Sequence, residues 1–239
     1  MAVVASTRWR RVLAVTAFSA IASGAAACSS SGPTPAGSLP DAASLLQRCS
    51  ARMRGIHSAR FQLSGKGSIA GVEVDTAQGL VTSDGKASGT VEIVQAGSHV
   101  QLQLVVIRRA IYIKGPTGGF QKLPSGAAGA VFDPSRILDP RSGLSRLVAT
   151  ATAAKTVGVD QVSGVSAYRV TARLDGGLLA SLMPIPARRT VPGTMWIGTG
   201  SPDLDQITVT VPGGGGSKSA ELTLRLTDFG VATNITPPP

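Results

Sequence analysis

The sequence is poor in the residues on which enzymes and metal sites depend. Its 239 residues include two histidines and two cysteines, aromatic residues make up 4%, and charged residues make up 15%. Neither His57 nor His99 lies in a metal-binding spacing such as HExxH, and no GxSxG nucleophile motif occurs. The sequence therefore predicts a protein that is not an enzyme, with no catalytic residues, no metal ligands and no cofactor.

The chain also lacks clustered charge. Three of its 23 Lys and Arg residues lie in the first 27 positions, so the rest carries 20 basic against 13 acidic residues, a net charge of +7. No run of five or more like charges occurs, which argues against a nucleic-acid partner. A moderately basic surface that faces anionic lipid headgroups explains this balance more simply.

The N-terminal apolar stretch is too short to span a bilayer, which takes about 20 residues. Arg8, Arg10 and Arg11 precede the apolar segment 12–21, and small residues follow up to Cys28. This order is typical of a signal peptide, so residues 1–27 are predicted to be removed. Ala25-Ala26-Ala27-Cys28 resembles a bacterial lipobox, which implies a diacylglycerol on Cys28. The alternative is cleavage after an Ala-x-Ala site that leaves Cys28 free, and Arg10-Arg11 leaves both Sec and Tat export open.

Residues 28–40 are rich in Ser, Gly and Pro and are predicted to be a flexible tether after the lipidated cysteine. The chain would then be anchored to the outer face of the cell membrane without spanning it. The second cysteine, Cys49, shares a helical spacing with Leu45, Leu46 and Met53, so it is expected on the buried face of a helix over 40–55.

After this helix the apolar period changes to two, which indicates strands. Short alternating runs with turn signals between them, Asp84-Gly85 the strongest, predict an antiparallel meander of five or six strands up to Ile113. Asp133-Pro134 and Asp139-Pro140 each place a capping residue before a proline, and the second predicts a helix over 140–153. Strands follow at 157–160, 166–174, 191–197, 206–211 and 220–229.

Helices segregated from an antiparallel sheet define the α+β class, and a single sheet this long must curl. Because aromatic residues are scarce, the core must consist of aliphatic side chains. The uncharged segment from Leu178 to Ile185, with glycines before it and prolines within and after it, has two interpretations: ordinary core packing, or a mobile cover over a lipid-sized cavity in which Met183 would adapt to varied acyl chains.

Several motifs resemble one known family over nearly the whole chain. They are the lipobox and tether, Gly89-Thr90-Val91-Glu92-Ile93, the stretch from Phe132 to Pro140 (FDPSRILDP), and the stretch from Val191 to Ile197 (VPGTMWI). Together they are similar to the mycobacterial LppX/LprA/LprF/LprG lipoproteins. The resemblance implies a single curled antiparallel sheet, a half-barrel, with helices on its concave face enclosing a hydrophobic cavity. This half-barrel domain would occupy residues 41–231, followed by a C-terminal tail at 232–239.

The same resemblance implies that the protein binds acylated lipids or glycolipids and carries them across the cell envelope. Only Val91 is carried over from the family as a ligand-binding residue. The alternation along strands and helices adds further candidates: Ile93, Leu102, Leu104, Leu144, Leu147, Val148, Leu178, Leu179, Leu182 and Met183. The alternative is an interaction lipoprotein without a cavity, acting on envelope partners or as an agonist of host Toll-like receptor 2, a role in which lipidated family members are known.

Overall fold

A computed structural model describes residues 38–67, 74–95, 97–108, 110–124, 132–183, 185, 188–211 and 219–239. Residues Leu39–Pro239 form one compact unit. Cys28, the signal peptide and nearly all of the tether lie outside the described residues, so the predicted lipidation and the boundary after residue 27 stay predictions.

The first element is the amphipathic helix that the sequence predicts. Helix α1 spans Ala42–Arg54, and the Asp41 side chain caps it by accepting a hydrogen bond of 2.8 Å from the Ser44 N–H. Its apolar face is buried, and Cys49 on that face is 0% exposed and unpaired. The prediction of a buried thiol is confirmed.

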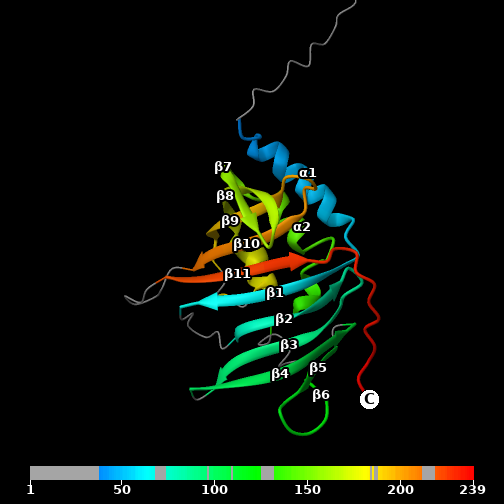
Figure 1. The fold of residues 1–239 in the computed structure, drawn as a ribbon. Coiled ribbons are helices and arrows are strands. Elements are labelled where there is room, and N and C mark those ends of the chain that lie inside the picture. Colours follow the sequence, from blue (N-terminus) through cyan, green and yellow to red (C-terminus); the bar gives the residue numbers. More distant parts are fainter. Residues whose placement is uncertain are drawn as a thin grey trace, which may run out of the picture. The chain divides into compact units, whose positions relative to one another are not determined.

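All strands belong to one 11-stranded sheet in the order β6-β5-β4-β3-β2-β1-β11-β10-β9-β8-β7, and every neighbouring pair is antiparallel (Figure 1). The strands before the central helices are β1 (Ser58–Lys66), β2 (Val74–Thr82), β3 (Lys86–Gln95), β4 (Ser98–Ile107), β5 (Ala110–Lys114) and β6 (Gln121–Lys122). Those after them are β7 (Thr152–Val162), β8 (Val165–Asp175), β9 (Thr190–Gly198), β10 (Leu204–Val211) and β11 (Ala220–Thr227).

All strands that are neighbours in the sheet also follow one another in the chain, except at one place. β11 pairs with β1, from Arg60 opposite Thr227 to Lys66 opposite Glu221, and this pairing joins the two meanders into one sheet. The edge strands β6 and β7 do not pair with each other, so the sheet stays open. The Asp84-Gly85 hairpin is confirmed, with Gly85 at φ 79°, a left-handed conformation that favours glycine.

The central helices are shorter than the sequence predicts. Asp133 caps the 3₁₀-helix η2 (Pro134–Arg136) as expected, but the helix predicted over 140–153 is wrong in its extent. Helix α2 covers only Leu144–Ala149, and β7 already begins at Thr152. Asp139 caps a tight turn instead, accepting from the N–H groups of Arg141 and Ser142 at 2.8 Å each. Gly143 then has an extended backbone whose missing Cβ would collide with the Asp139 and Ile137 carbonyl oxygens.

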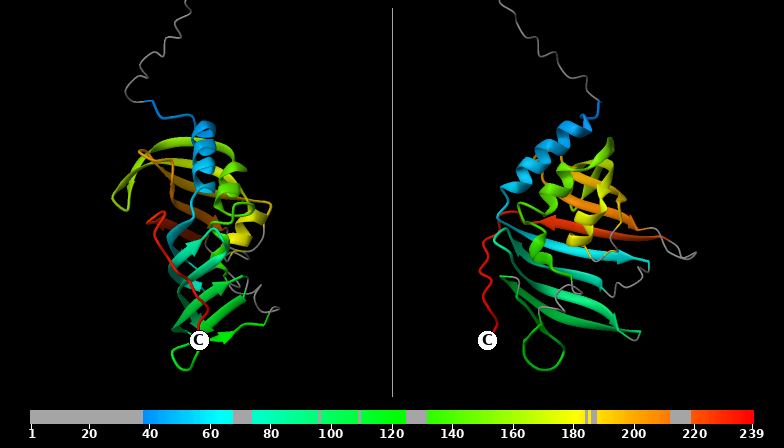
Figure 2. Two further views of the ribbon diagram at one scale, coloured as in Figure 1. Left: turned by 90° about the vertical axis from the view of Figure 1, so that its right-hand side faces the viewer. Right: turned by 180° about the vertical axis from the view of Figure 1, so that it is seen from behind.

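The apolar segment after β8 forms helix α3, Gly176–Leu182, and Asp175 caps it through a 2.8 Å bond from the Leu178 N–H. Helices α1, α2 and α3 all lie on one face of the sheet, as the rear view in Figure 2 shows. We call this the inner face. The expected α+β class is confirmed: an open, curved antiparallel sheet with helices on one face. Within the described residues, no helix has the length and apolarity needed to cross a membrane.

Candidate functional site

The inner face of strands β2 to β5 carries a row of aliphatic side chains in fixed register. Val91 of β3 lies opposite Ala77 of β2 and Leu102 of β4, while Leu104 of β4 lies opposite Ile113 of β5. Side chains alternate between the faces of a strand, so residues paired in this way share a face. We call these inner-face residues of β2 to β5 the graded row.

The name describes how burial changes along the strands. Beside the β2–β3 hairpin the row is at most 3% exposed, and its members there are Val81, Ala87, Leu104, Val106 and Ile111. Toward the opposite end, Ala77 and Val91 are still buried, but Val74, Ile93, Val100 and Leu102 are only half-buried. Ile113 of β5, level with Leu104, is half-buried as well. An aliphatic surface that opens gradually toward one end is suited to hold a hydrocarbon chain that enters from that end.

The inner face of β8 to β11 is different, because its apolar side chains are buried along nearly the whole length, with Tyr168 near the start of β8 as a half-buried exception. Val170, Leu174, Met195 and Val209 are 0% exposed, and Leu224 is 1% exposed. The α-helices cover this part, with α2 and α3 against β8 and α3 against β9, whereas η2 packs on β2 and β3. We call these strands with α1 to α3 the capped half of the domain.

The candidate residues on helices belong to this cover. Leu144, Leu147 and Val148 of α2 are all 0% exposed. Helix α1 packs directly against α2, and the Ser50 hydroxyl donates a hydrogen bond of 2.9 Å to the Ser145 carbonyl oxygen. These α2 side chains therefore lie between α1 and the sheet, where they fill the core.

The candidate residues around α3 are more varied. Leu179, Leu182 and Met183 are 0%, 1% and 2% exposed, whereas Leu178 is only partly buried at the edge of the same core. Ile185, the end of the apolar segment, is 8% exposed. The predicted mobile cover is thus a short helix with one buried face, and its mobility stays a prediction.

The structure brings most of the predicted ligand-binding residues into one apolar cluster. Its buried members among them are Val91, Leu104, Leu144, Leu147, Val148, Leu179, Leu182 and Met183, and Ile93 and Leu178 pack against it. Leu102 shares their face through its pairing with Val91 and is half-buried. Whether these side chains contact a lipid, and whether they enclose a cavity, stays a prediction.

Sequence reasoning missed four apolar residues as ligand-binding candidates, two in the graded row and two elsewhere in the apolar core. Val74, Ile113 and Leu123 pack against the core while half-buried, and Phe132 lies edge-on to Phe61 with ring centroids 6.2 Å apart. Alternation identifies Val74 and Ile113 as strand residues, but only the cross-strand register shows that they share a face with Val91.

A partly buried polar cluster lies where α1 meets the sheet in the capped half, with the Arg52 side chain 47% exposed. Arg52 of α1 forms an ion pair with Asp203, with Nε and Oδ1 2.8 Å apart, and the Asp203 side chain is 12% exposed. Burial, together with the neighbouring Asp203 carboxylate, raises the pKa of Asp205 to about 6, and its Oδ2 is buried with no hydrogen-bond partner. Burial also raises the pKa of the Cys49 thiol far above its usual range, so this cysteine is inert at neutral pH.

A polar surface pocket lies apart from the graded row. It has a volume of about 360 Å³, and its lining includes His57, Lys86 and Asn234. The C-terminal segment forms one of its walls and is fixed to β1, because the Ser58 hydroxyl donates to the Val231 carbonyl oxygen at 2.6 Å. Val231 and Ile235 are the only apolar residues of its lining, so the pocket is poorly suited to an acyl chain.

Two lipoproteins of known structure share this fold, an open sheet with helices on one apolar face. The crystal structure of LprF from Mycobacterium bovis matches with a TM-score of 0.69 at 20% identity, covering 83% of this chain and 97% of LprF. That of LppX from Mycobacterium tuberculosis matches with a TM-score of 0.60 at 17% identity, covering 83% of this chain and all of LppX (100%).

The chain belongs to the LppX_LprAFG lipoprotein family, whose model matches residues 41–235. Among its curated relatives, the lipoarabinomannan carrier protein LprG of Mycobacterium tuberculosis is 29% identical over 233 residues, covering 96% of each chain. LprG of Mycolicibacterium smegmatis is 31% identical over 216 residues, covering 89% of each chain. The putative lipoprotein LprA of Mycobacterium tuberculosis is 26% identical over 206 residues, covering 83% of this chain and 82% of LprA. The resemblance stated from the sequence is confirmed.

Proposed function

We propose that this protein is a membrane-anchored lipid carrier that holds the acyl chain of a lipid or glycolipid against the graded row. The observation that carries the proposal is the change in burial along β2 to β5, from at most 3% exposed at one end to half-buried at the other. A filled core would be buried at both ends of its strands, as the inner face of β9 to β11 is.

The energy of binding would come from removing the hydrocarbon from water. Each buried methylene contributes about 0.8 kcal/mol, so a sixteen-carbon chain contributes on the order of 10 kcal/mol before entropic costs. Such a gain needs an apolar wall and few polar contacts, which agrees with the aliphatic composition of the row. The interaction is non-directional, and for that reason it can accept acyl chains of different lengths.

The relatives support an acylated glycolipid as the ligand class. LprG, at 29% identity over nearly the whole chain, is named a lipoarabinomannan carrier. A carrier in this family would shield the acyl chains of such a molecule inside the protein while its polar part stays in water. We extend this role, with transfer of the lipid across the envelope, to the present chain.

The anchor would be a diacylglycerol on Cys28, followed by a tether that ends before α1. Twelve residues from Cys28 to Leu39 span at most about 40 Å when extended. Helix α1 would therefore stay close to the membrane surface, and its exposed Arg48 and Arg54 would face anionic headgroups together with Arg146 of α2. Replacement of Cys28 by alanine should release the protein from membranes without changing the folded domain.

The decisive experiment adds bulk to the graded row. We expect Val91→Trp to fill the space beside β3 and to abolish co-purification of lipid, measured by native mass spectrometry of protein from its own host. Val94→Trp is the matched control, because Val94 is 40% exposed on the opposite face of the same strand. Its lipid content should equal that of the wild type.

Circular dichroism would first show that both tryptophan variants fold. Unchanged lipid in folded Val91→Trp protein would overturn the location of the site. Absence of any lipid from the wild-type protein would overturn the carrier function itself.

A second candidate function is an interaction lipoprotein without a cavity. The complete burial of Leu144, Leu147 and Val148 favours it, because these side chains already fill the space beneath α1. In that case an activity such as recognition by Toll-like receptor 2 would be lost in Cys28→Ala but retained in Val91→Trp. A carrier-dependent activity would be lost in both variants.

A further inference from the structure

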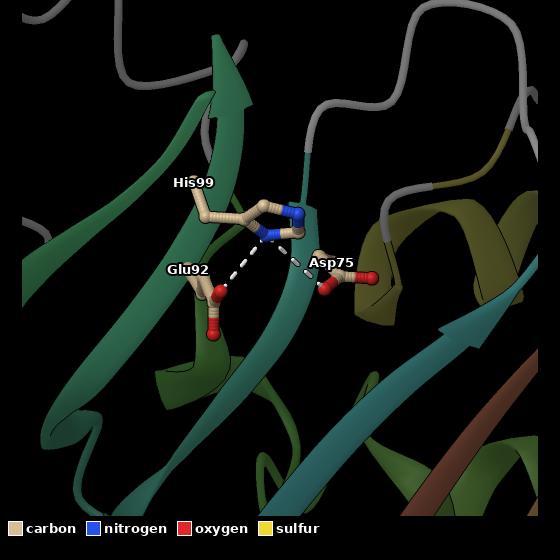
Figure 3. Close-up of side chains that lie close together, drawn as sticks. All are labelled: Asp75, Glu92 and His99. Carbon is tan, nitrogen blue, oxygen red and sulfur yellow. Dashed lines mark ion pairs between the residues drawn. The ribbon is translucent and has the colours of Figure 1, made fainter. Parts of the chain in front are cut away.

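Three adjacent strands bring a histidine and two carboxylates together on the outer face of the sheet, opposite the helices. Asp75 comes from β2, Glu92 from β3 and His99 from β4, and Figure 3 shows the imidazole directed toward both carboxylates. Glu92 lies opposite Thr76 on one side and Gln101 on the other, and His99 lies opposite Val94. Within the described part of the chain, this is the one group of three such side chains with metal-ligand spacing.

A register shift in β2 makes the cluster possible. Val74 pairs with Ile93 and Thr76 pairs with Glu92, so Asp75 is an extra residue with no partner of its own. In strict alternation with Ala77, Asp75 would point toward the core. The bulge directs it to the outer face, a change of side-chain direction that bulges commonly produce.

The distances suit a small metal ion. His99 Nδ1 lies 2.9 Å from Glu92 Oε1 and 3.7 Å from Asp75 Oδ2. One donor atom from each residue lies within 4.8 Å of the other two. Zinc binds nitrogen and oxygen ligands at about 2.0–2.2 Å, so two ligands of a tetrahedral ion are about 3.4 Å apart. The two measured separations lie on either side of that value.

The surroundings favour a cation as well. The Thr76 hydroxyl donates a hydrogen bond of 3.4 Å to Glu92 Oε2, which leaves Oε1 directed at the imidazole. A hydrogen bond to the oxygen that does not bind the metal fixes the orientation of a ligating carboxylate. The three side chains are 36–59% exposed, so water could complete the coordination of a bound ion.

We propose that Asp75, Glu92 and His99 form a binding site for one divalent transition-metal cation, with Zn²⁺ as its probe. An imidazole nitrogen with two carboxylate oxygens suits Zn²⁺ and similar ions, whereas Ca²⁺ and Mg²⁺ prefer oxygen ligands alone. A cation held there would cross-link β2, β3 and β4 at the end where the graded row is half-buried. This proposal does not depend on the lipid-carrier function.

The test is calorimetric titration of ZnCl₂ into the chain carrying Cys28→Ala and no polyhistidine tag. That substitution removes a thiol that could compete for zinc, and the remaining Cys49 is buried. We expect one ion per chain. Loss of an orienting contact alone weakens metal sites 10–100-fold, so His99→Ala should weaken binding at least tenfold. Glu92→Gln should have a similar effect.

The chain provides its own control, because His57 is the only other histidine and is also exposed. His57→Ala should bind Zn²⁺ as the wild type does, and both variants should keep the wild-type circular dichroism spectrum. Since an ion that binds only the folded state stabilises it, Zn²⁺ should raise the Tm of the wild type and of His57→Ala but not of His99→Ala.

Three results would overturn the proposal. They are no saturable binding of Zn²⁺, binding that survives His99→Ala, and equal loss of binding in His57→Ala. The first result would leave His99 as a partner in surface ion pairs only. Equal affinity for Ca²⁺ and Zn²⁺ would also count against it, because it would mean that the imidazole contributes nothing.

Discussion

The graded row and the capped half are built from the same kind of strand, yet they bury their side chains differently. Both are antiparallel, both carry aliphatic residues on the inner face, and β1 and β11 join them in one continuous sheet. In the capped half, three α-helices cover the inner face, and its apolar residues are buried at both ends of β9, β10 and β11. Across β2 and β3 the cover is the short helix η2, and burial declines toward one end.

This difference indicates that the capped half mainly stabilises the fold, whereas the graded row is available for binding. Burial of aliphatic surface stabilises a fold in proportion to the area removed from water, so the capped half should supply most of the folding energy. The half-buried end of the graded row still exposes apolar surface, which a hydrocarbon ligand could cover. The three predictions below, in order of decreasing effect, test this division.

The largest expected effect comes from a pair of matched truncations. Leu224→Ala in β11 removes a side chain that is 1% exposed and should lower the free energy of unfolding by about 3 kcal/mol. Leu102→Ala in β4 should cost less, about 1 kcal/mol in lipid-free protein, because this side chain is already partly exposed to water. Urea unfolding at a constant m value measures both. Equal losses would show that the two regions contribute alike.

A smaller effect should follow from breaking the link between α1 and the sheet. Arg52→Ala leaves Asp203, whose side chain is 12% exposed, without its ion-pair partner and should cost about 1.5 kcal/mol. The matched control is Arg60→Ala. Its pair with Asp228 has a similar length of 2.9 Å but more than half of each side chain exposed, so it should cost less than about 0.5 kcal/mol. A cost for Arg52→Ala as small as the control would mean that this pair does not hold the helix in place.

The smallest expected effect is an increase in stability at neutral pH when the partly buried carboxylate of Asp205 is replaced. The pKa of Asp205 is raised from 3.8 to about 6 on folding, so the folded state keeps a proton that the unfolded state has lost. The contribution of Asp205 to stability should therefore be present in full below pH 4, fall between about pH 4 and 6, and stay constant above that. The full shift corresponds to about 3 kcal/mol, but partial exposure of the group reduces this to about 1 kcal/mol.

The variant Asp205→Asn should remove that decline. It should be more stable than the wild type at pH 7 by about 1 kcal/mol and equal to it at pH 4, as measured by urea unfolding at both values. A wild-type stability that rises between pH 4 and 6, with no difference from the variant, would contradict the raised pKa.

Most elements could be predicted from the sequence because their signals are local. The Asp133 cap, the Asp84-Gly85 hairpin and the alternation in β4 each depend on residues within a few positions of one another. The helix predicted after Pro140 was wrong in its extent, although the capping role predicted for Asp139 was correct. Asp139 does cap the following N–H groups, yet the close packing of Gly143 on the Asp139 carbonyl oxygen ends that turn before α2 begins.

The candidate site was predicted only in part, for a related reason. The family resemblance supplied Val91, and alternation selected Ile93, Leu102 and Leu104, which lie on the same face of the sheet as Val91. It could not distinguish them from the leucines of α2, since a helix that fills a core and one that lines a cavity have the same apolar spacing. Nor could spacing in the sequence reveal Asp75, Glu92 and His99, which meet through a bulge and two strand pairings.

The order of nearby residues was enough to predict most of the strands, the cap at Asp133 and the buried face of α1, and motifs were enough to identify the family. It did not reveal the two-residue strand β6 or the early start of β7 at Thr152. The tertiary structure was needed to show which apolar side chains are fully buried and which remain partly exposed, and which polar side chains lie close together. Those properties depend on how much of one sheet a few short helices can cover, and that area is set by contacts between residues far apart in the chain.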